Sequence, residues 1–197
     1  MVEPSGVVGA GLGDPTARAV RAARRLVSAG GLAAATIDAV SREAGVSNGS
    51  LYHWFGDRTG LLEAAQLDFY AEIDGLAREA MASGLPDDRD ESVRFVVSAW
   101  VGFLTVENRA FPAFSAGPGV AGTVLATNAT AFQKAQLSAV SVWIHDGFGC
   151  SCATTDRIVL LLVSLAGLLA HPSGGSRRPL VIDTYVEAIL GVLDRAD

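Results

Sequence analysis

Residues 36–55 read TIDAVSREAGVSNGSLYHWF, and this stretch decides the fold of the N-terminal part of the chain. It holds two short segments, 37–44 and 48–54, whose apolar residues recur at helical spacing. Gly45 stands between them and can adopt the left-handed backbone that a tight turn needs. Each segment follows a hydroxyl residue of the type that caps helix N-termini, Thr36 and Ser47. The stretch therefore predicts two short helices joined by a tight turn, which is a helix-turn-helix.

The first residues of the second helix are small and polar. Side chains of this kind can meet base edges or phosphates when such a helix enters the major groove. Glycine at position 49 would let the helix backbone come close to DNA. The residues expected to face the nucleic acid from this part are Ser47, Asn48, Gly49, Ser50 and His53.

Helix signals continue on both sides of this stretch. Asp14 and Pro15 can start a helix that Gly30 and Gly31 end, and Asp57 can cap another helix that begins near Arg58. We therefore expect a helix-turn-helix domain over residues 14–62. Residues 1–13 are rich in glycine and lack periodicity, which predicts a disordered tail.

The charge of the chain is unevenly distributed. The net charge of −6 alone argues against nucleic acid, but residues 14–62 carry six arginines and four carboxylates. The acidic excess lies in the rest of the chain. A basic first quarter on an acidic remainder is typical of a DNA reader joined to a module that does not touch phosphate.

The whole of residues 36–55 resembles the signature of the TetR family of transcriptional regulators. The resemblance extends back through residues 22–26 and forward through residues 56–62. It implies an all-α fold with a three-helix DNA-binding domain followed by a helical ligand-binding and dimerisation domain, here residues 63–197. It also implies a regulator, with repression as the family's usual mode, that a small molecule releases from a palindromic DNA operator.

The resemblance also assigns roles to individual residues. It implies that Thr36 and Tyr52 hold DNA phosphates, and that Ser50 and His53 face the groove. Arg58 stands where the family commonly has a phosphate-binding lysine, and Trp54 either flanks the sugar-phosphate backbone or is partly buried. Asn48 departs from the family pattern, because a lysine is frequent there. We therefore expect a shallower salt dependence of DNA binding, since each neutralised phosphate contributes about −0.9 to the slope.

Residues 63–197 read as helices, at about 91–107, 120–145 and 180–193, with a further apolar helix that Thr154 or Thr155 caps and that ends near Ala170. We find no strand-period segment. Aromatic and amide side chains on these helices could line an effector pocket, although most of the aromatics are expected in the core. The candidates are Trp100, Phe103, Phe111, Phe114, Asn128, Phe132 and Gln136. The expected effector is a small apolar or aromatic molecule.

The run from Ile158 to Ala170 would form a helix that is apolar on nearly all sides. This is more apolar surface than a helix of a monomer can bury with one face. The run is too short for a bilayer, which needs about 20 residues. With the helix at 180–193 it predicts a homodimer interface, formed by about 156–170 and 180–193. A dimer would supply the two-fold symmetry that a palindromic operator requires.

The sequence also allows three other hypotheses, which are a metal sensor, an oxidant sensor and an enzyme. His145, Cys150 and Cys152 could sense a metal or an oxidant, although a plain loop is the favoured interpretation and no metal site is assigned. No nucleophile, acid and base stand together, so an enzyme is not expected, nor is a cofactor. The N-terminus lacks the charge pattern of a secretory signal, and the two cysteines are expected to be reduced, which favours the cytoplasm.

Overall fold

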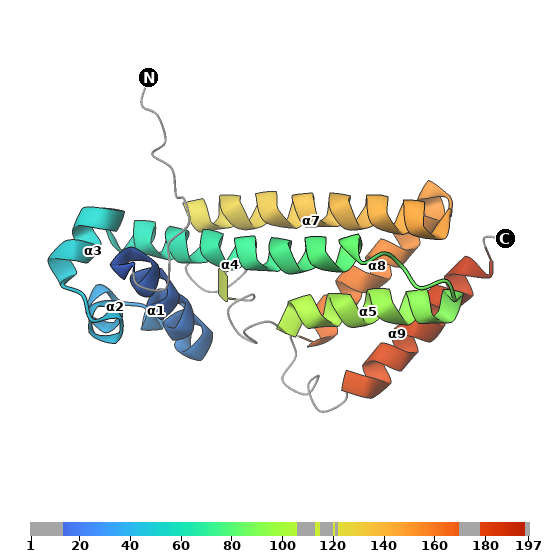
Figure 1. The fold of residues 1–197 in the computed structure, drawn as a ribbon, viewed down its shortest axis with the longest axis horizontal. Helices are drawn as coiled ribbons and strands as arrows, with labels where there is room; N and C mark the ends of the chain where they lie inside the picture. Colours follow the sequence, from blue (N-terminus) through green and yellow to red (C-terminus); the bar gives the residue numbers. More distant parts are fainter. Residues whose placement is uncertain (1–13, 106–112, 115–119, 121, 170–177, 196–197) are drawn as a thin grey trace, which may run out of the picture. The chain divides into compact units, whose positions relative to one another are not determined.

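The computed structural model describes residues 14–105, 113–114, 120, 122–169 and 178–195, with the backbone alone at 103–105, 166–169 and 178. All regular structure in these ranges is helical (Figure 1), which confirms the expected all-α fold. The chain divides into two compact units. The first comprises Met1–Phe69 and Pro112–Asn128, and the second comprises Tyr70–Phe111 and Ala129–Asp197. The division falls within a helix, past the boundary expected at residue 62.

Three helices, one short 3-10 turn and the first part of a fourth helix form the N-terminal part of the first unit (Figure 1). Their bounds are α1 Pro15–Gly30, η1 Leu32–Ala34, α2 Ile37–Ala44, α3 Asn48–Phe55 and α4 Arg58–Ala82. The expected helix starts are confirmed by side chains that accept hydrogen bonds from backbone N–H groups of the first turn. The capping residues are Asp14, Thr36, Ser47 and Asp57. The 3-10 turn η1 has no counterpart among the elements expected from the sequence.

The core of the first unit is built from small side chains on α1. These let α2 pack closely against α1, and Leu51 of α3 is fully buried beside them. The buried apolar residues of these three helices are Ala19, Ala22, Ala23, Val27, Ile37, Val40, Ala44 and Leu51. The short apolar faces that the sequence showed are therefore the faces that form this core.

The second unit contains α5 (Arg89–Thr105), α8 (Cys152–Leu169), α9 (Arg178–Leu193) and most of α7 (Val124–Phe148). Helices α5, α8 and α9 pack on one another (Figure 1). Trp100 of α5 donates a hydrogen bond from Nε1 to the carbonyl of Leu162 in α8, at 2.7 Å. Their shared core includes Val93, Val97, Ile144, Ile158, Leu162, Leu165 and Ile189.

Three expected boundaries in the second unit are corrected. Thr154 and Thr155 do not cap α8, because the helix begins at Cys152 and Ser151 Oγ accepts from the Thr154 N–H at 3.2 Å. Both threonines are buried in the first turn instead. Helix α9 begins at Arg178, since a proline at the next position is compatible with a first helical turn. Helix α7 begins at Val124 and reaches Phe148.

Within the described ranges, no helix combines the length and the apolar character needed to span a membrane.

Candidate nucleic-acid interface

The turn between α2 and α3 is held by its own backbone. Gly45 ends α2 in the left-handed region, at φ 66° and ψ 42°. The Val46 N–H donates to the Ser41 carbonyl at 3.1 Å, and Ser41 Oγ donates to the Val46 carbonyl at 2.6 Å. A side chain at position 45 would be strained by the positive φ, so glycine is the residue that fits this turn. These bonds fix the direction in which α3 leaves α2.

Helix α3 presents two different faces. Leu51 is fully buried, whereas Tyr52 is 52% exposed and His53 is exposed. Trp54 and Phe55 are both half-buried, and their rings meet edge to face at 6.3 Å between centroids. The aromatic hydroxyl and imidazole groups therefore stand on the surface, while the apolar face holds the helix to the domain.

The N-terminal turn of α3 carries side chains that are already hydrogen-bonded within the fold. Ser47 Oγ accepts from the Ser50 N–H at 3.0 Å and lies 2.9 Å from Ser50 Oγ. Asn48 Nδ2 donates to Asp38 Oδ1 of α2 at 2.6 Å. All three polar side chains remain accessible to a partner, since Ser47 and Asn48 are exposed and Ser50 is half-buried. The contact to Asp38 was not foreseen, because sequence periodicity does not report which exposed side chains of two helices meet.

Two glycines near α3 differ in what the fold requires of them. A Cβ added at Gly49 would meet only Ser47 Oγ, at an ordinary 3.7 Å. A Cβ added at Gly60 would lie 2.1 Å from the Phe55 carbonyl oxygen, which no backbone can accommodate without moving. The fold therefore explains Gly60 and leaves Gly49, an exposed helical glycine, to be explained by something outside the domain.

Arg58 is turned toward the backbone of its own domain. Its Nε donates to the Ala35 carbonyl at 2.9 Å and its Nη2 donates to the Leu32 carbonyl, both next to η1. The side chain is half-buried. This arrangement ties the start of α4 to the segment that precedes Thr36, which the sequence did not indicate.

Three other arginines of the first unit also bind within it. Arg18 Nε donates to the Ala44 carbonyl at 3.3 Å, and Arg25 pairs with Glu43 at 2.7 Å. Arg24 is buried, pairs with Asp68 at 2.7 Å and lies over the ring of Phe69 at 5.5 Å. The basic character that the sequence showed is therefore used largely to join α1 to α2 and α4.

The residues expected to line an effector pocket are distributed over both units. Phe111 lies outside the described residues, and the side chain of Phe103 is not described. Phe114 is fully buried against Phe69, with 5.7 Å between the ring centroids, and Asn128 donates to Glu63 at 3.3 Å. Phe114 and Asn128 belong to the first unit, whereas Trp100, Phe132 and Gln136 belong to the second.

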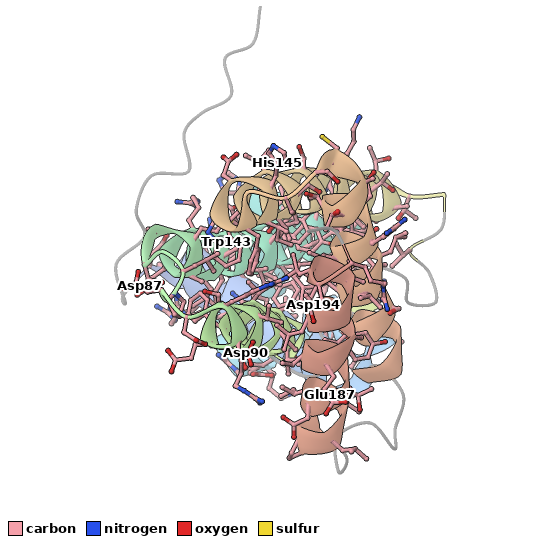
Figure 2. All side chains as sticks on the ribbon, turned by 90° about the vertical axis from the view of Figure 1, so that its right-hand side faces the viewer. Asp87, Asp90, Trp143, His145, Glu187 and Asp194 are labelled. Carbon is pink, nitrogen blue, oxygen red and sulfur yellow. The ribbon has the colours of Figure 1, made fainter. Side chains whose placement is uncertain are left out.

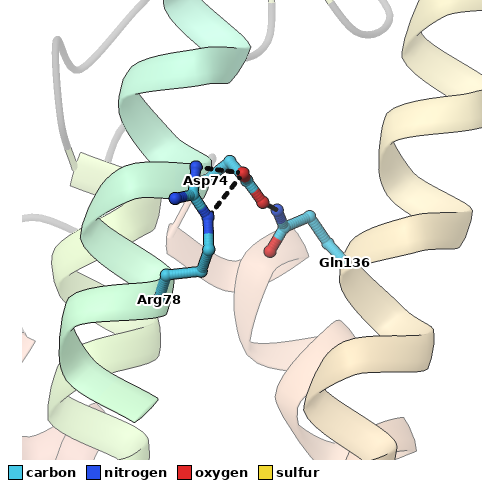
Figure 3. Close-up of polar contacts among 3 residues, drawn as sticks. All are labelled: Asp74, Arg78 and Gln136. Atoms are coloured by element: carbon cyan, nitrogen blue, oxygen red, sulfur yellow. Dashed lines mark hydrogen bonds and ion pairs between the residues drawn. The ribbon is translucent and has the colours of Figure 1, made fainter. Parts of the chain in front are cut away.

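In the second unit, two contacts join α4 to α7. The rings of Tyr70 and Phe132 stack at 4.0 Å between centroids. Asp74 accepts from Gln136 Nε2 at 3.1 Å and from Arg78 Nη2 at 2.6 Å (Figure 3). Phe132 and Gln136 therefore hold the two helices together, which is a structural role.

Two hollows of the second unit share Met81 and Trp143. One is an open groove of about 1070 Å³, lined by both ends of the α4–α5 connection and by α7. The other is an apolar void of about 10 Å³ among α4, α5, α7 and α8, also lined by Trp100, Val140 and Leu162. A void of this size holds about one water molecule at most. Met81 and Trp143 were not among the expected pocket residues.

The three residues weighed as a sensor are not assembled into one site. Cys150 Sγ lies 3.3 Å from Thr155 Oγ1 and is half-buried, while Cys152 and His145 are exposed (Figure 2). In the part of the chain that the structure describes, no three His, Cys, Asp or Glu side chains are grouped so that they could hold a metal ion.

The N-terminal helices match a known family of proteins. Residues 19–65 match the family model described as bacterial regulatory proteins, tetR family. The BetI transcriptional regulator of Vibrio campbellii is 31% identical over 85 residues, which are 43% of each chain. The BetI regulator of Stenotrophomonas maltophilia is 33% identical over 72 residues, or 36% of this chain and 37% of the relative. The chain thus spans less than half the length of the curated relatives that it matches.

Solved structures match over almost the whole chain. A TetR-family transcriptional regulator from Streptomyces coelicolor superposes with a TM-score of 0.72 at 24% identity, covering 93% of this chain and 90% of the other. The fatty acid degradation regulator FadR from Bacillus halodurans does so with a TM-score of 0.63 at 15% identity, covering 90% and 96%. At these identities the likeness establishes the fold, which extends through both units.

Proposed function

We propose that this chain, whose residues 19–65 match the TetR family of bacterial regulatory proteins, is a dimeric repressor of that family. In this proposal a small molecule releases it from a palindromic DNA operator. It acts by binding and not by catalysis. The observation that carries the proposal is the geometry of α3, whose polar N-terminal residues face solvent while Leu51 anchors it. A target on chromosomal DNA would place the protein in the cytoplasm.

The proposed reading surface is the exposed side of α2 and α3. Thr36 and Tyr52 hold phosphates, Ser50 and His53 face the groove, and Gly49 allows close approach of the DNA backbone. The exposure of Thr36, Tyr52 and His53 supports these roles. Exposed Ser47 and Asn48 belong to the same surface, and half-buried Trp54 lies at its edge.

Arg58 has two roles in this proposal, one beside the DNA and one within its own domain. We keep it as a neighbour of the DNA backbone, but its bonds to the Ala35 and Leu32 carbonyls support a positioning function. By holding η1 against the start of α4, Arg58 would fix the position of Thr36 relative to the DNA phosphates. Because Arg18, Arg24 and Arg25 also bind within the unit, fewer cations are directed at phosphates, and the salt dependence of binding should be shallow.

The proposed dimer forms through α8 and α9, within about 156–170 and 180–193. Leu160, Val163 and Leu180 are exposed on these helices, and Leu160 and Leu180 are 68% and 66% exposed. Large aliphatic side chains gathered on two packed helices are typical of an interface. A two-fold dimer presents each α3 once, and would read half-sites about 34–36 Å apart or a multiple of that spacing.

The proposed effector is a small apolar or aromatic molecule that binds in the second unit. The apolar void beside Trp100 and Trp143 supports this site, since its walls carry almost only hydrocarbon. The void is too small for a ligand as it stands, so Met81 and Trp143 would have to move to open it toward the groove that they also line.

The proposed signal passes along α4. Gln66, on the buried side of this helix, donates from Nε2 to the carbonyls of Phe114 at 2.9 Å and Leu125 at 2.8 Å. These bonds hold Phe114 and the start of α7 to α4. The same helix is held to α1 by the ion pair of Asp68 with Arg24. A shift of α4 would therefore be felt by the reading helices. The loss of operator affinity equals the difference in how well the effector binds the two states.

The test is selection of binding sites from random duplex DNA with the purified protein. Recovery of a palindrome supports the dimeric reader and supplies a probe for effector screening, in which release of the probe is measured. Failure to enrich any sequence at low salt would contradict the proposal. A monomer in sedimentation at the same concentration would contradict the dimer.

A further inference from the structure

Asn48 and Asp38 form the closest polar contact between the exposed surfaces of α2 and α3 that the structure records, at 2.6 Å. Asn48 is the first residue of α3, and Asp38 lies in the first turn of α2. Both side chains are exposed. The pair therefore stands where the N-terminus of a recognition helix meets base edges, and not in the interior of the domain.

The chemistry of the pair fixes which way the amide of Asn48 faces. An ionised carboxylate can only accept hydrogen bonds, so the Asn48 Nδ2 group must face Asp38. The bond is charge-assisted, which makes it stronger than a bond between neutral groups. The Oδ1 atom of Asn48 is therefore directed away from Asp38 and stays available as an acceptor. A free asparagine, by contrast, can turn its amide to present either group.

An acceptor and a nearby negative charge select one kind of base edge. In the major groove, adenine offers an N6 amino donor and cytosine offers an N4 amino donor, whereas guanine and thymine present acceptors at the matching positions. Oδ1 of Asn48 can accept from the amino groups, and the charge of Asp38 repels acceptor-rich edges. The lysine that is frequent at this position in the family would favour the opposite partners, phosphate or guanine.

We propose that Asp38 is a specificity-determining residue that orients the Asn48 amide so that it reads an amino-bearing base, adenine or cytosine, in each half of the operator. This inference rests on the proposed DNA-binding function. It adds to that function the class of base read at one position. It also predicts that Asp38 acts without touching DNA itself.

Four proteins are compared by selection from random duplex DNA at one salt concentration: the wild type, Asn48→Ala, Asp38→Ala and Glu43→Ala. Glu43 is the matched control, because it is an exposed carboxylate on the same helix that pairs with Arg25 and does not contact Asn48. Both carboxylate variants remove one negative charge near the DNA, so any general gain in affinity is common to both. Thermal unfolding by circular dichroism confirms that each variant is folded.

We expect Asn48→Ala to lose the preference at one base pair in each half-site, where the wild type favours adenine or cytosine by about tenfold. Asp38→Ala should reduce the preference at the same base pair to about threefold or less, and Glu43→Ala should leave it unchanged. Replacing the amino-bearing base of that pair by an analogue without the exocyclic amino group, purine for adenine or 2-pyrimidinone for cytosine, should weaken binding of the wild type and leave binding of Asn48→Ala unchanged. Equal binding of the wild type to both duplexes, or full preference in Asp38→Ala, would overturn the inference. An equal loss of affinity for all sequences in Asn48→Ala would do the same, since it would make Asn48 a phosphate ligand.

The two levels of the proposal fail in different ways. If the wild type enriches no sequence, the proposed function fails and this inference fails with it. If the wild type enriches a palindrome that Asn48→Ala and Asp38→Ala read unchanged, the proposed function stands and only the role of Asp38 is lost.

Discussion

The guanidinium of Arg24 lies 2.7 Å from the carboxylate of Asp68 and joins the buried side of α1 to α4. The side chain of Arg24 is 8% exposed and that of Asp68 is 46% exposed. The pair is therefore a buried cation held by a carboxylate at the edge of the domain. Phe69 places its ring beside the same guanidinium, so charge and apolar contact act on one group.

Removing the carboxylate should destabilise the protein. In Asp68→Ala the buried cation of Arg24 loses its charged partner, and we expect the free energy of unfolding to fall by about 1–3 kcal/mol. The partial exposure of Asp68 keeps the loss below that of a fully buried pair. Urea denaturation at fixed protein concentration measures the change. Glu43→Ala, which breaks the more exposed pair with Arg25, should change stability by less than about 1 kcal/mol; equal losses in the two variants would refute the distinction.

Substitution by alanine should change the stability of the protein in opposite directions at Gly49 and at Gly60. Gly49→Ala adds a methyl group where there is room and replaces a poor helix former, so stability should rise by up to about 1 kcal/mol. Operator affinity should nevertheless fall, because the methyl group would stand between α3 and the DNA backbone. Thermal unfolding and equilibrium binding to the selected operator give the two readouts.

Gly60→Ala is the matched comparison. Its methyl group would collide with the Phe55 carbonyl, so the thermal midpoint should fall. If Gly49→Ala binds the operator as tightly as the wild type, Gly49 has no role in close approach.

Variants at Tyr52 and Arg58 should distinguish a residue that contacts DNA from one that holds the helix-turn-helix in place. Tyr52→Phe removes an exposed hydroxyl, so operator binding should weaken about equally for all sequences without a change in thermal midpoint. Arg58→Ala removes the donors to Ala35 and Leu32, so both the midpoint and the binding should fall. Unchanged operator binding in both variants would show that the reading surface is assigned wrongly. An unchanged midpoint in Arg58→Ala would argue against its positioning role.

The exposed leucine of α8 should be needed for the dimer. Leu160→Glu places a charge on the proposed interface, so the protein should sediment as a monomer and lose affinity for the full palindrome. Val142→Glu is the control, since Val142 of α7 is 58% exposed and lies on neither interface helix. Dimers that persist in Leu160→Glu, or that are lost equally in Val142→Glu, would exclude the proposed surface.

Much of the fold followed from short-range patterns. The spacing of apolar residues and the capping side chains predicted α1 to α4 and their starts, because a cap bonds to N–H groups two or three residues away. The glycine at 45 predicted the turn for the same local reason, since its left-handed backbone is a property of one residue. The start of α8 was predicted wrongly, because three hydroxyl residues within five positions compete for the cap and Ser151 takes it.

The sequence by itself determined where the reading helix lies, that the fold is all helical and which face of α3 is apolar. Only the tertiary structure decided what the polar side chains do with one another. It paired Asn48 with Asp38, Arg24 with Asp68 and Gln66 with two distant carbonyls. The physical reason is range: helix periodicity and caps act within a few residues, whereas a hydrogen bond between helices depends on packing that no local pattern encodes. The proposed base specificity of Asn48 depends on such a bond.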